Sequence, residues 1–251
     1  MPLCFRWRTA SAPTAPAPAI ACWPCPSPWR AAGSWSTSMA SGEGARVHGP
    51  FKAVAFDLLT ALLDSWRLWN EVAGDEALGL AWRRAYLELT YGAGAYRPYE
   101  DIVAVAAVRA GVPAEVPGRL IAAWDRLQPW PEVPQVLRTL SARLPLAVVT
   151  NCSEALGARA VARLGVPIQA VVTAEAAGAY KPRAAPYRLA LERLGTAPAE
   201  TLFVAGSAAD VPGASGVGMP VFWHNRLGLA PLPDARPAWT AETLRSLPDV
   251  V

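Results

Sequence analysis

The sequence predicts an α/β fold in which helices cover both faces of a parallel sheet and a block of helices is inserted after the first strand. Two observations lead to this prediction. Short apolar runs of strand length recur along the chain, at residues 53–56, 146–149, 170–173, 201–205 and 219–223. After residue 129 these runs alternate with stretches of helix length, and such alternation is typical of a parallel sheet.

The first apolar run leads directly to one carboxylate, Asp57, after which apolar residues resume. A run of this kind is typical of a buried parallel strand. Ligands of open α/β sheets gather beyond the carboxyl ends of the strands, where Asp57 is expected to lie. An acid at that place reacts, binds a cation or pairs with a base. The alternative is that Asp57 caps the next helix.

Residues 65–128 are predicted to form an all-helical cap. Apolar and aromatic residues recur there at spacings of three and four, and Gly92, Gly94 and Pro98 interrupt the pattern. Because this block separates the first strand from the second, the core is expected in two segments, residues 49–64 and 129–251.

Beyond the cap, helices are expected at residues 135–144, 154–164 and 185–194. The proline-rich tail from residue 230 is expected to wrap over the surface and to end in a helix at residues 240–247.

Residues 1–48 are rich in Pro, Ala, Ser and Trp and show no periodicity. Such a stretch cannot bury enough apolar surface to offset its ordering entropy, so we expect it to be disordered. The alternative is a mis-called extension, with the true start at Met39.

Composition limits the partners. The four arginines and one glutamate of residues 1–48 account for the whole formal charge of +3, so the remaining chain is neutral and gives no electrostatic argument for nucleic acid. No apolar run approaches the roughly 20 residues of a membrane span.

Three of the four cysteines lie in the first 25 residues, which suits a reducing cytosol. We therefore expect a cytoplasmic protein that binds a small molecule and neither nucleic acid nor membrane. A homodimer is expected if the cap exposes apolar area.

Polar residues follow each of the first four strands, and in a parallel sheet all of them reach one edge. They are Asp57, Thr150, Asn151, Lys181, Ser207 and Asp210. A carboxylate nucleophile needs a positive neighbour, and Lys181 is one of only two lysines in the chain. Hydroxyl and amide groups are suited to hold the second carboxylate oxygen or the anion of a substrate.

The stretch from Phe56 to Ser65, FDLLTALLDS, resembles the first motif, FDxDGTLxDS, of the haloacid dehalogenase-like hydrolase superfamily. The resemblance implies a Rossmann-like core with a helical cap. Phosphatases of that superfamily carry a general-acid aspartate where this chain has Leu59, and a magnesium-binding aspartate where it has Gly206. These departures argue against metal-dependent phosphoryl transfer, and no cofactor is expected. Magnesium is expected only under the alternative of a phosphatase with an eroded motif.

Further stretches resemble the 2-haloacid dehalogenase branch. Residues 82–88, WRRAYLE, resemble WRxxQLE, which implies that Arg83 faces the halide and the carboxylate. Residues 150–153, TNCS, resemble SNGS, which implies that Thr150 and Asn151 line the pocket. Lys181-Pro182 with Tyr187 resembles KPxxxxY, whose two side chains reach the site.

The chemistry that this resemblance implies begins with attack of Asp57 on the carbon that bears the halide, which gives an ester on the enzyme. Halide leaves without a general acid. Water then attacks the ester, positioned or activated by Asp210. Lys181 holds Asp57 ionised, and Arg83 and Asn151 receive the halide.

Three positions depart from this branch. Ala61, Ala205 and Ser207 stand where the dehalogenases carry a threonine, a serine and an asparagine. Thr60 is one position earlier than the family's threonine and is expected to point in another direction. Two alternatives therefore remain open, the phosphatase and a non-catalytic relative that binds a carboxylate metabolite or a partner protein.

Overall fold

Six parallel strands form one sheet at the centre of the computed structural model, which describes residues 51–233 and 235–251. The predictions for residues 1–48 lie outside this described part. The strands are β1 (Ala53–Asp57), β2 (Leu146–Thr150), β3 (Ala170–Thr173), β4 (Thr201–Ala205), β5 (Val221–His224) and β6 (Trp239–Ala241). Their order is β3-β2-β1-β4-β5-β6, and every neighbouring pair is parallel. The predicted α/β class is therefore confirmed.

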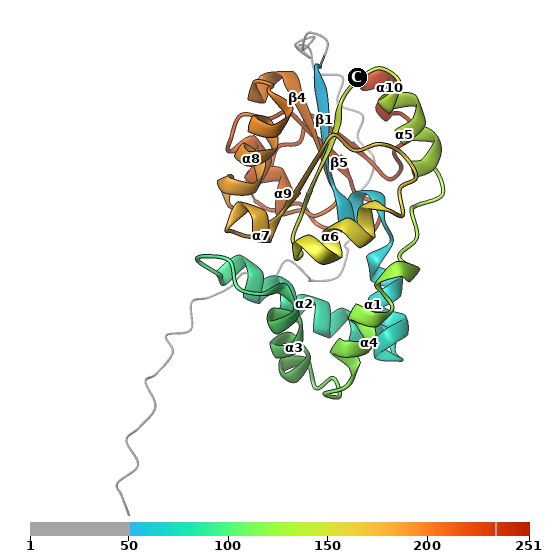
Figure 1. The fold of residues 1–251 in the computed structure, drawn as a ribbon, viewed down its shortest axis with the longest axis vertical. Helices are drawn as coiled ribbons and strands as arrows, with labels where there is room; N and C mark the ends of the chain where they lie inside the picture. The colour runs from blue at the N-terminus through green and yellow to red at the C-terminus, as the bar shows by residue number, and fades with distance from the viewer. Residues whose placement is uncertain (1–50, 234) are drawn as a thin grey trace, which may run out of the picture. The chain divides into compact units, whose positions relative to one another are not determined.

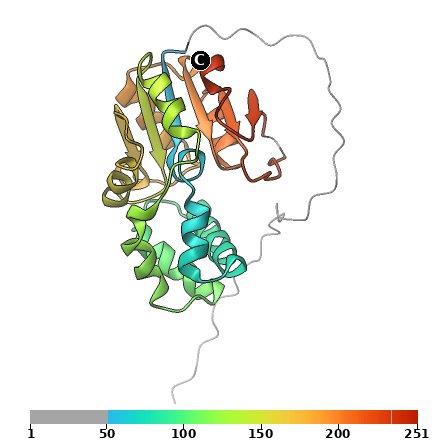
Figure 2. The same cartoon turned by 90° about the vertical axis from the view of Figure 1, so that its right-hand side faces the viewer.

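Helices cover both faces of this sheet (Figures 1 and 2). Every residue of β1 is therefore buried, although alternate side chains point to opposite faces. Val54 and Phe56 join the apolar cluster that includes α5, and Ala53 and Ala55 join the cluster that includes α8. The helices outside the cap region are α5 (Val133–Ser141), α6 (Glu154–Val161), α7 (Ala174–Ala177), α8 (Ala184–Leu194), α9 (Asp210–Ser215) and α10 (Leu247–Val250). Single 3₁₀ turns form at Trp124–Arg126 and Pro198–Glu200.

The inserted region between β1 and β2 is helical, as expected. It comprises α1 (Ser65–Ala73), α2 (Glu76–Gly92), α3 (Tyr99–Ala110) and α4 (Val116–Ala122). Asp64 and Asp75 cap the first two helices by accepting backbone N–H groups. Trp69 and Trp82 pack together with ring centroids 4.5 Å apart, and the indole of Trp82 donates to the Val103 carbonyl at 2.9 Å. These buried tryptophans join the helices into one cap.

The chain passes from the sheet to the cap and back through two segments that lie side by side. Leu63 and Pro129 form an antiparallel bridge, and Asp64 N donates to the Gln128 carbonyl at 2.8 Å. We propose that this paired crossing divides a core of residues 49–64 and 129–251 from a cap of residues 65–128.

The prediction of a helix at residues 240–247 is wrong. Residues 239–241 instead form β6, in which Trp239 pairs with Phe222 of β5. Leu244 and Leu247, in the stretch predicted to be helical, are buried against the core from an irregular segment and from the start of α10. Pairing with the open edge of β5 thus outweighs the local helical pattern.

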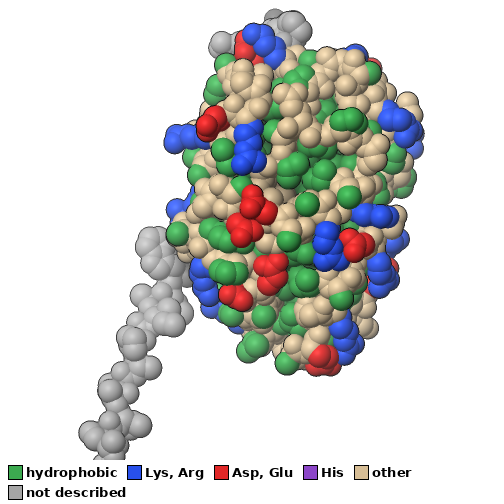
Figure 3. All heavy atoms as spheres, viewed as in Figure 1, with side chains coloured by type: hydrophobic (Ala, Val, Ile, Leu, Met, Phe, Trp, Pro, Cys, Tyr) green, Lys and Arg blue, Asp and Glu red, His purple; other side chains and the backbone are tan. Residues whose placement is uncertain are grey.

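On the face of the molecule drawn in Figure 3, acidic and basic side chains are interspersed with apolar ones. Among the described residues, no helix combines the length and the hydropathy needed to cross a membrane.

Candidate active site

Asp57 ends β1 at the point where the strand order reverses, with β2 on one side and β4 on the other. This switch point is where open α/β sheets bind ligands. A single π-helical turn, Leu58–Leu62, follows at once. Asp57 caps that turn: its Oδ2 accepts from the backbone N–H of Thr60 at 2.9 Å and of Ala61 at 3.0 Å. The Thr60 hydroxyl donates to the same oxygen, so this side chain does reach the carboxylate.

Lys181 is the charge partner of Asp57. Its Nζ lies 2.7 Å from Asp57 Oδ1 and 3.0 Å from Asp210 Oδ2, and all three side chains are buried. Capping and ion pairing, which the sequence left as alternatives for Asp57, therefore occur together on its two oxygens.

Two polar side chains hold this ion cluster in place. The amide of Asn151 brackets the Lys181 backbone, accepting from its N–H at 2.7 Å and donating to its carbonyl at 3.1 Å. The hydroxyl of Tyr187 donates to Asp210 Oδ1 at 2.8 Å. Asn151 therefore positions Lys181, a role that the sequence did not suggest.

The pKa values of the two acids in the cluster are shifted in opposite directions. Burial raises the pKa of Asp57, but the charge of Lys181 and the hydrogen bonds from Lys181, Thr60 and Ala61 outweigh this effect, so the pKa lies below the ordinary 3.8. Burial also raises the pKa of Asp210, and the charge of Lys181 only partly opposes it, so this pKa stays above 3.8. Burial lowers the pKa of Lys181, but its two carboxylates raise it above 10.5. Asp57 is thus the ionised acid and Asp210 the more basic one.

Gly206, directly after β4, lies against the turn that follows Asp57. A Cβ built on this glycine would overlap the backbone nitrogen of Ala61 and the hydroxyl of Thr60. The close approach excludes any side chain here, including the aspartate that phosphatases use to bind magnesium. The two carboxylates of the cluster are already bonded to Lys181, and no group of three or more His, Cys, Asp or Glu in the described ranges could hold a metal ion. The residues present therefore do not fit a magnesium ion.

Arg83, on α2, is a buried cation with 5% of its surface exposed. Its Nη1 donates to Ser65 Oγ at 2.9 Å, and its guanidinium stacks 4.1 Å from the centre of the Trp66 ring. Its Nε has no hydrogen-bond partner, and within the described part of the chain no carboxylate pairs with it. Burial lowers the pKa of Arg83 below its ordinary value, and the opposing effects of Tyr99, Tyr86 and Asp57 do not outweigh it.

The remaining predicted residues lie around the cluster. Ser207, after β4, meets the hydroxyl of Tyr91 from α2 at 3.3 Å, so core and cap touch here. The cap also reaches the end of β2, where the Tyr86 hydroxyl donates to the Asn151 carbonyl at 2.9 Å. Thr150 is fully buried, and its hydroxyl faces Cys152 Sγ at 3.5 Å.

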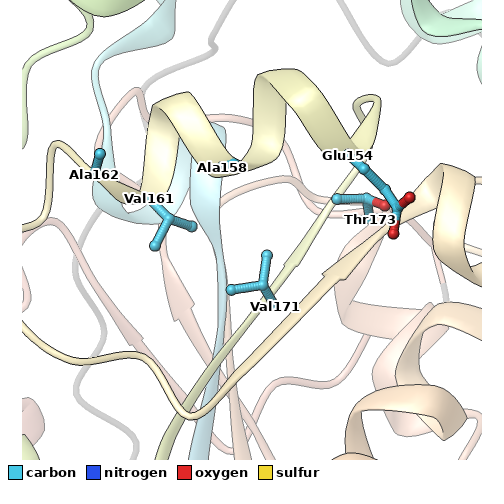
Figure 4. Close-up of a pocket in the computed structure, with 6 residues that line it drawn as sticks. All are labelled: Glu154, Ala158, Val161, Ala162, Val171 and Thr173. Carbon is cyan, nitrogen blue, oxygen red and sulfur yellow. The ribbon is translucent and has the colours of Figure 1, made fainter.

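A separate surface cavity of about 440 Å³ lies between α6 and the edge strand β3 (Figure 4). Its lining is mostly apolar and consists of Glu154, Ala158, Val161, Ala162, Val171 and Thr173. None of the residues of the Asp57 site lines this cavity, so the two are separate.

The family described as haloacid dehalogenase-like hydrolase matches residues 51–218. The chain belongs to this family. An (S)-2-haloacid dehalogenase from Pseudomonas sp. (strain YL) is 30% identical over 222 residues, covering 78% of this chain and 92% of that protein. The (S)-2-haloacid dehalogenase 4A of Burkholderia cepacia is 29% identical over 197 residues, covering 72% of this chain and 85% of that protein.

A solved structure is similar throughout the fold. It is an L-2-haloacid dehalogenase from Xanthobacter autotrophicus with chloropropionic acid covalently bound. The likeness has a TM-score of 0.71 and 25% identity, and it covers 80% of this chain and 98% of that one. The predicted 2-haloacid dehalogenase branch of the haloacid dehalogenase-like hydrolases is thus confirmed.

Sequence reasoning assigned no partner in the site to three side chains of this region. Ser65 and Tyr91 bond to Arg83 and Ser207 respectively, and Trp66 stacks on the Arg83 guanidinium. For Tyr91 the sequence does hold an indication. This residue lies eight positions after Arg83, roughly two turns further along the same helix. Which of these side chains reaches the core depends on how the cap packs.

Proposed function

We propose that this protein hydrolyses small 2-haloacids through an ester on Asp57, and that Arg83 binds the substrate anion. The observation that carries the proposal is the buried guanidinium of Arg83, which meets no carboxylate in the described ranges and lies within the electrostatic reach of the buried Asp57–Lys181 pair. A buried charge without a counter-ion is costly, so an anionic ligand is the natural partner of Arg83. The named activities of the relatives support a 2-haloacid as that ligand.

In the first step, Asp57 Oδ1 attacks the carbon that bears the halide. Oδ2 already accepts three hydrogen bonds, whereas Oδ1 accepts one, from Lys181, and keeps a lone pair for attack. A carbon–oxygen bond forms as the carbon–halogen bond breaks, and the halide leaves with the bonding pair toward Arg83. Halide needs no proton to leave, which suits the apolar Leu59 at the position of the phosphatase general acid.

In the second step, water attacks Cγ of the Asp57 ester and gives its proton to Asp210. The charge that develops on Oδ2 is held by the N–H groups of Thr60 and Ala61, which already point at that oxygen. Collapse of the intermediate breaks the bond between Cγ and the former Oδ1, and the 2-hydroxy acid leaves with that oxygen and takes up a proton. The raised pKa of Asp210 suits it to accept the proton of the water.

The test is halide release from the two enantiomers of 2-chloropropionate in buffer that contains a chelator. We expect release from the S enantiomer, because the relatives are named for it, and a mass adduct on the Asp57 peptide after rapid quenching. Asp57→Asn removes both signals, whereas Asp101→Asn, at an exposed carboxylate of α3, keeps them. A single turnover in heavy-oxygen water leaves the label in Asp57 and not in the product.

The phosphatase alternative has its own outcome in the same experiment. Magnesium-dependent cleavage of a phosphoester, lost in Asp57→Asn and without any halide release, would replace the present proposal. No release of either kind would leave a protein that only binds carboxylates.

We also propose a cytoplasmic homodimer. Val105 and Val108 lie exposed about one turn apart on α3, which is the apolar area that the sequence argument required of the cap. Light scattering on the purified protein measures the oligomeric state, and Val108→Glu is expected to shift a dimer toward the monomer.

A further inference from the structure

The turn that follows Asp57 depends on outside partners for its carbonyl groups. A single helical turn has no next turn to accept from, so its last carbonyls need other donors. Leu58 O accepts from Leu63 N at 3.0 Å, inside this segment, and Leu62 O accepts from Trp130 N at 3.0 Å. The three carbonyls between them are met by side chains: Leu59 O by Ser65 Oγ, Thr60 O by Trp130 Nε1 at 3.0 Å and Ala61 O by His224 Nδ1 at 2.9 Å.

The contact on the Thr60 carbonyl acts on one of the donors that hold Asp57. A peptide unit is planar, so its C=O and the next N–H turn together and point in opposite directions. The carbonyl of Thr60 shares its plane with the N–H of Ala61, which donates to Asp57 Oδ2 at 3.0 Å. A donor on the Thr60 carbonyl therefore fixes the direction of the Ala61 N–H.

The indole of Trp130 is itself held rigidly. The guanidinium of Arg226 stacks on its ring at 4.6 Å from the centroid. Glu132 fixes that guanidinium with two hydrogen bonds, of 3.0 and 3.1 Å. A ring restrained on its face and bonded at its N–H leaves the peptide little freedom to rotate.

We propose that Trp130 is a positioning residue for the hydrolysis of the ester, because its N–H aims the Ala61 N–H at Asp57 Oδ2. The inference rests on the proposed function, since Oδ2 is the oxygen that gains charge when water attacks. In the alkylation step this oxygen loses charge as the ester forms. The Trp130 hydrogen bond therefore matters most in the second step.

The test is Trp130→Phe, which removes the N–H and keeps an aromatic ring for Arg226. The matched control is Trp124→Phe, because Trp124 Nε1 donates to the Leu156 carbonyl at 3.0 Å, an equal bond outside the Asp57 site. Direct loss of an oxyanion donor slows catalysis by about 100-fold or more, so loss of its support is expected to lower kcat by about tenfold.

The diagnostic readout is whether kcat and KM for 2-chloropropionate change together or separately. Because halide loss comes before ester hydrolysis, a slower hydrolysis lowers kcat and KM together and leaves kcat/KM unchanged. We expect the esterified fraction of the Asp57 peptide to rise in Trp130→Phe and not in Trp124→Phe. Equal behaviour of the two variants, or a fall in kcat/KM alone, would overturn the role of Trp130.

A second variant covers a failure of Trp130→Phe to fold. Benzothienylalanine at position 130 keeps the shape of the indole and lacks the N–H, and the same kinetic split is expected from it. Absence of any ester in the unmodified protein would count against the proposed function itself. An ester that forms normally and is hydrolysed at an unchanged rate in both variants would count against this inference alone.

Discussion

Replacing Lys181 by methionine removes the cation that bonds two buried carboxylates. Lys181 Nζ lies 2.7 Å from Asp57 and 3.0 Å from Asp210, and its side chain is 3% exposed. Removing one partner of a buried ion pair leaves an uncompensated charge and typically costs about 3–5 kcal/mol. We expect Lys181→Met to lower the free energy of unfolding by about that amount at pH 7.

The chain supplies its own control, because its other lysine is also paired with a carboxylate. Lys52 Nζ lies 2.7 Å from Glu200, but the two side chains are 64% and 38% exposed. Exposed pairs contribute little to stability, so Lys52→Met should change the free energy of unfolding far less than Lys181→Met. The Lys52–Glu200 and Lys181–Asp57 distances are equal, so the difference between the two variants reports burial and the second carboxylate bonded to Lys181.

The dependence on pH gives a second measurement. Without Lys181, the folded-state pKa of Asp57 rises and that of Asp210 rises further above its unfolded value, because burial and the other carboxylate are opposed less strongly. A raised acid pKa favours the folded state at low pH, and that advantage is lost as pH rises through it. Urea unfolding should therefore show the deficit of Lys181→Met shrinking from pH 7 to pH 5. Equal losses in the two lysine variants, or a deficit independent of pH, would refute the reasoning.

Three further predictions follow from the same geometry. Arg83→Met should lower halide release by about 100-fold with little loss of thermal stability, because it removes a buried charge that meets no carboxylate among the described residues, whereas Arg109→Met on the exposed face of α3 should change neither. Ester formation in a rapid-quench single turnover should be constant from about pH 5 to about pH 9, because the Asp57 carboxyl has a pKa below 3.8 and the Lys181 ammonium has one above 10.5, and a limb inside that range would contradict the ion pair. Gly206→Ala should lower both activity and the free energy of unfolding, the latter by about 1–3 kcal/mol, because its Cβ would displace the Ala61 nitrogen, and an unaffected variant would show that the turn is not packed as described.

The departures of this chain from the dehalogenase pattern take on a structural meaning. Ala61 stands where the family carries a threonine, and Thr60 supplies a hydroxyl to Asp57 from the preceding position. The π-helical form of the turn makes this possible, because it brings the Thr60 side chain and N–H back to the same oxygen. Ser207 stands where the family carries an asparagine, and the Tyr91 hydroxyl lies 3.3 Å from it.

By itself, the sequence determined strands β1 to β5, the inserted helices and the ion cluster. Apolar runs long enough for strands and buried on both faces require a parallel sheet, and such a sheet brings every carboxyl end to one edge. Asp57, Lys181 and Asp210 were therefore predictable as neighbours, although 124 and 29 residues separate the bonded pairs.

Only the tertiary structure decided which side chains meet across the boundary between core and cap. The Tyr91–Ser207 and Tyr86–Asn151 hydrogen bonds depend on how the cap packs on the sheet, and no local pattern encodes that packing. Strand β6 was also decided by the tertiary structure. It is three residues long and forms because the edge of β5 is open to pair with it. Periodicity reveals which face of an element is buried, whereas the partner of a single donor is set by the packing of whole elements against one another.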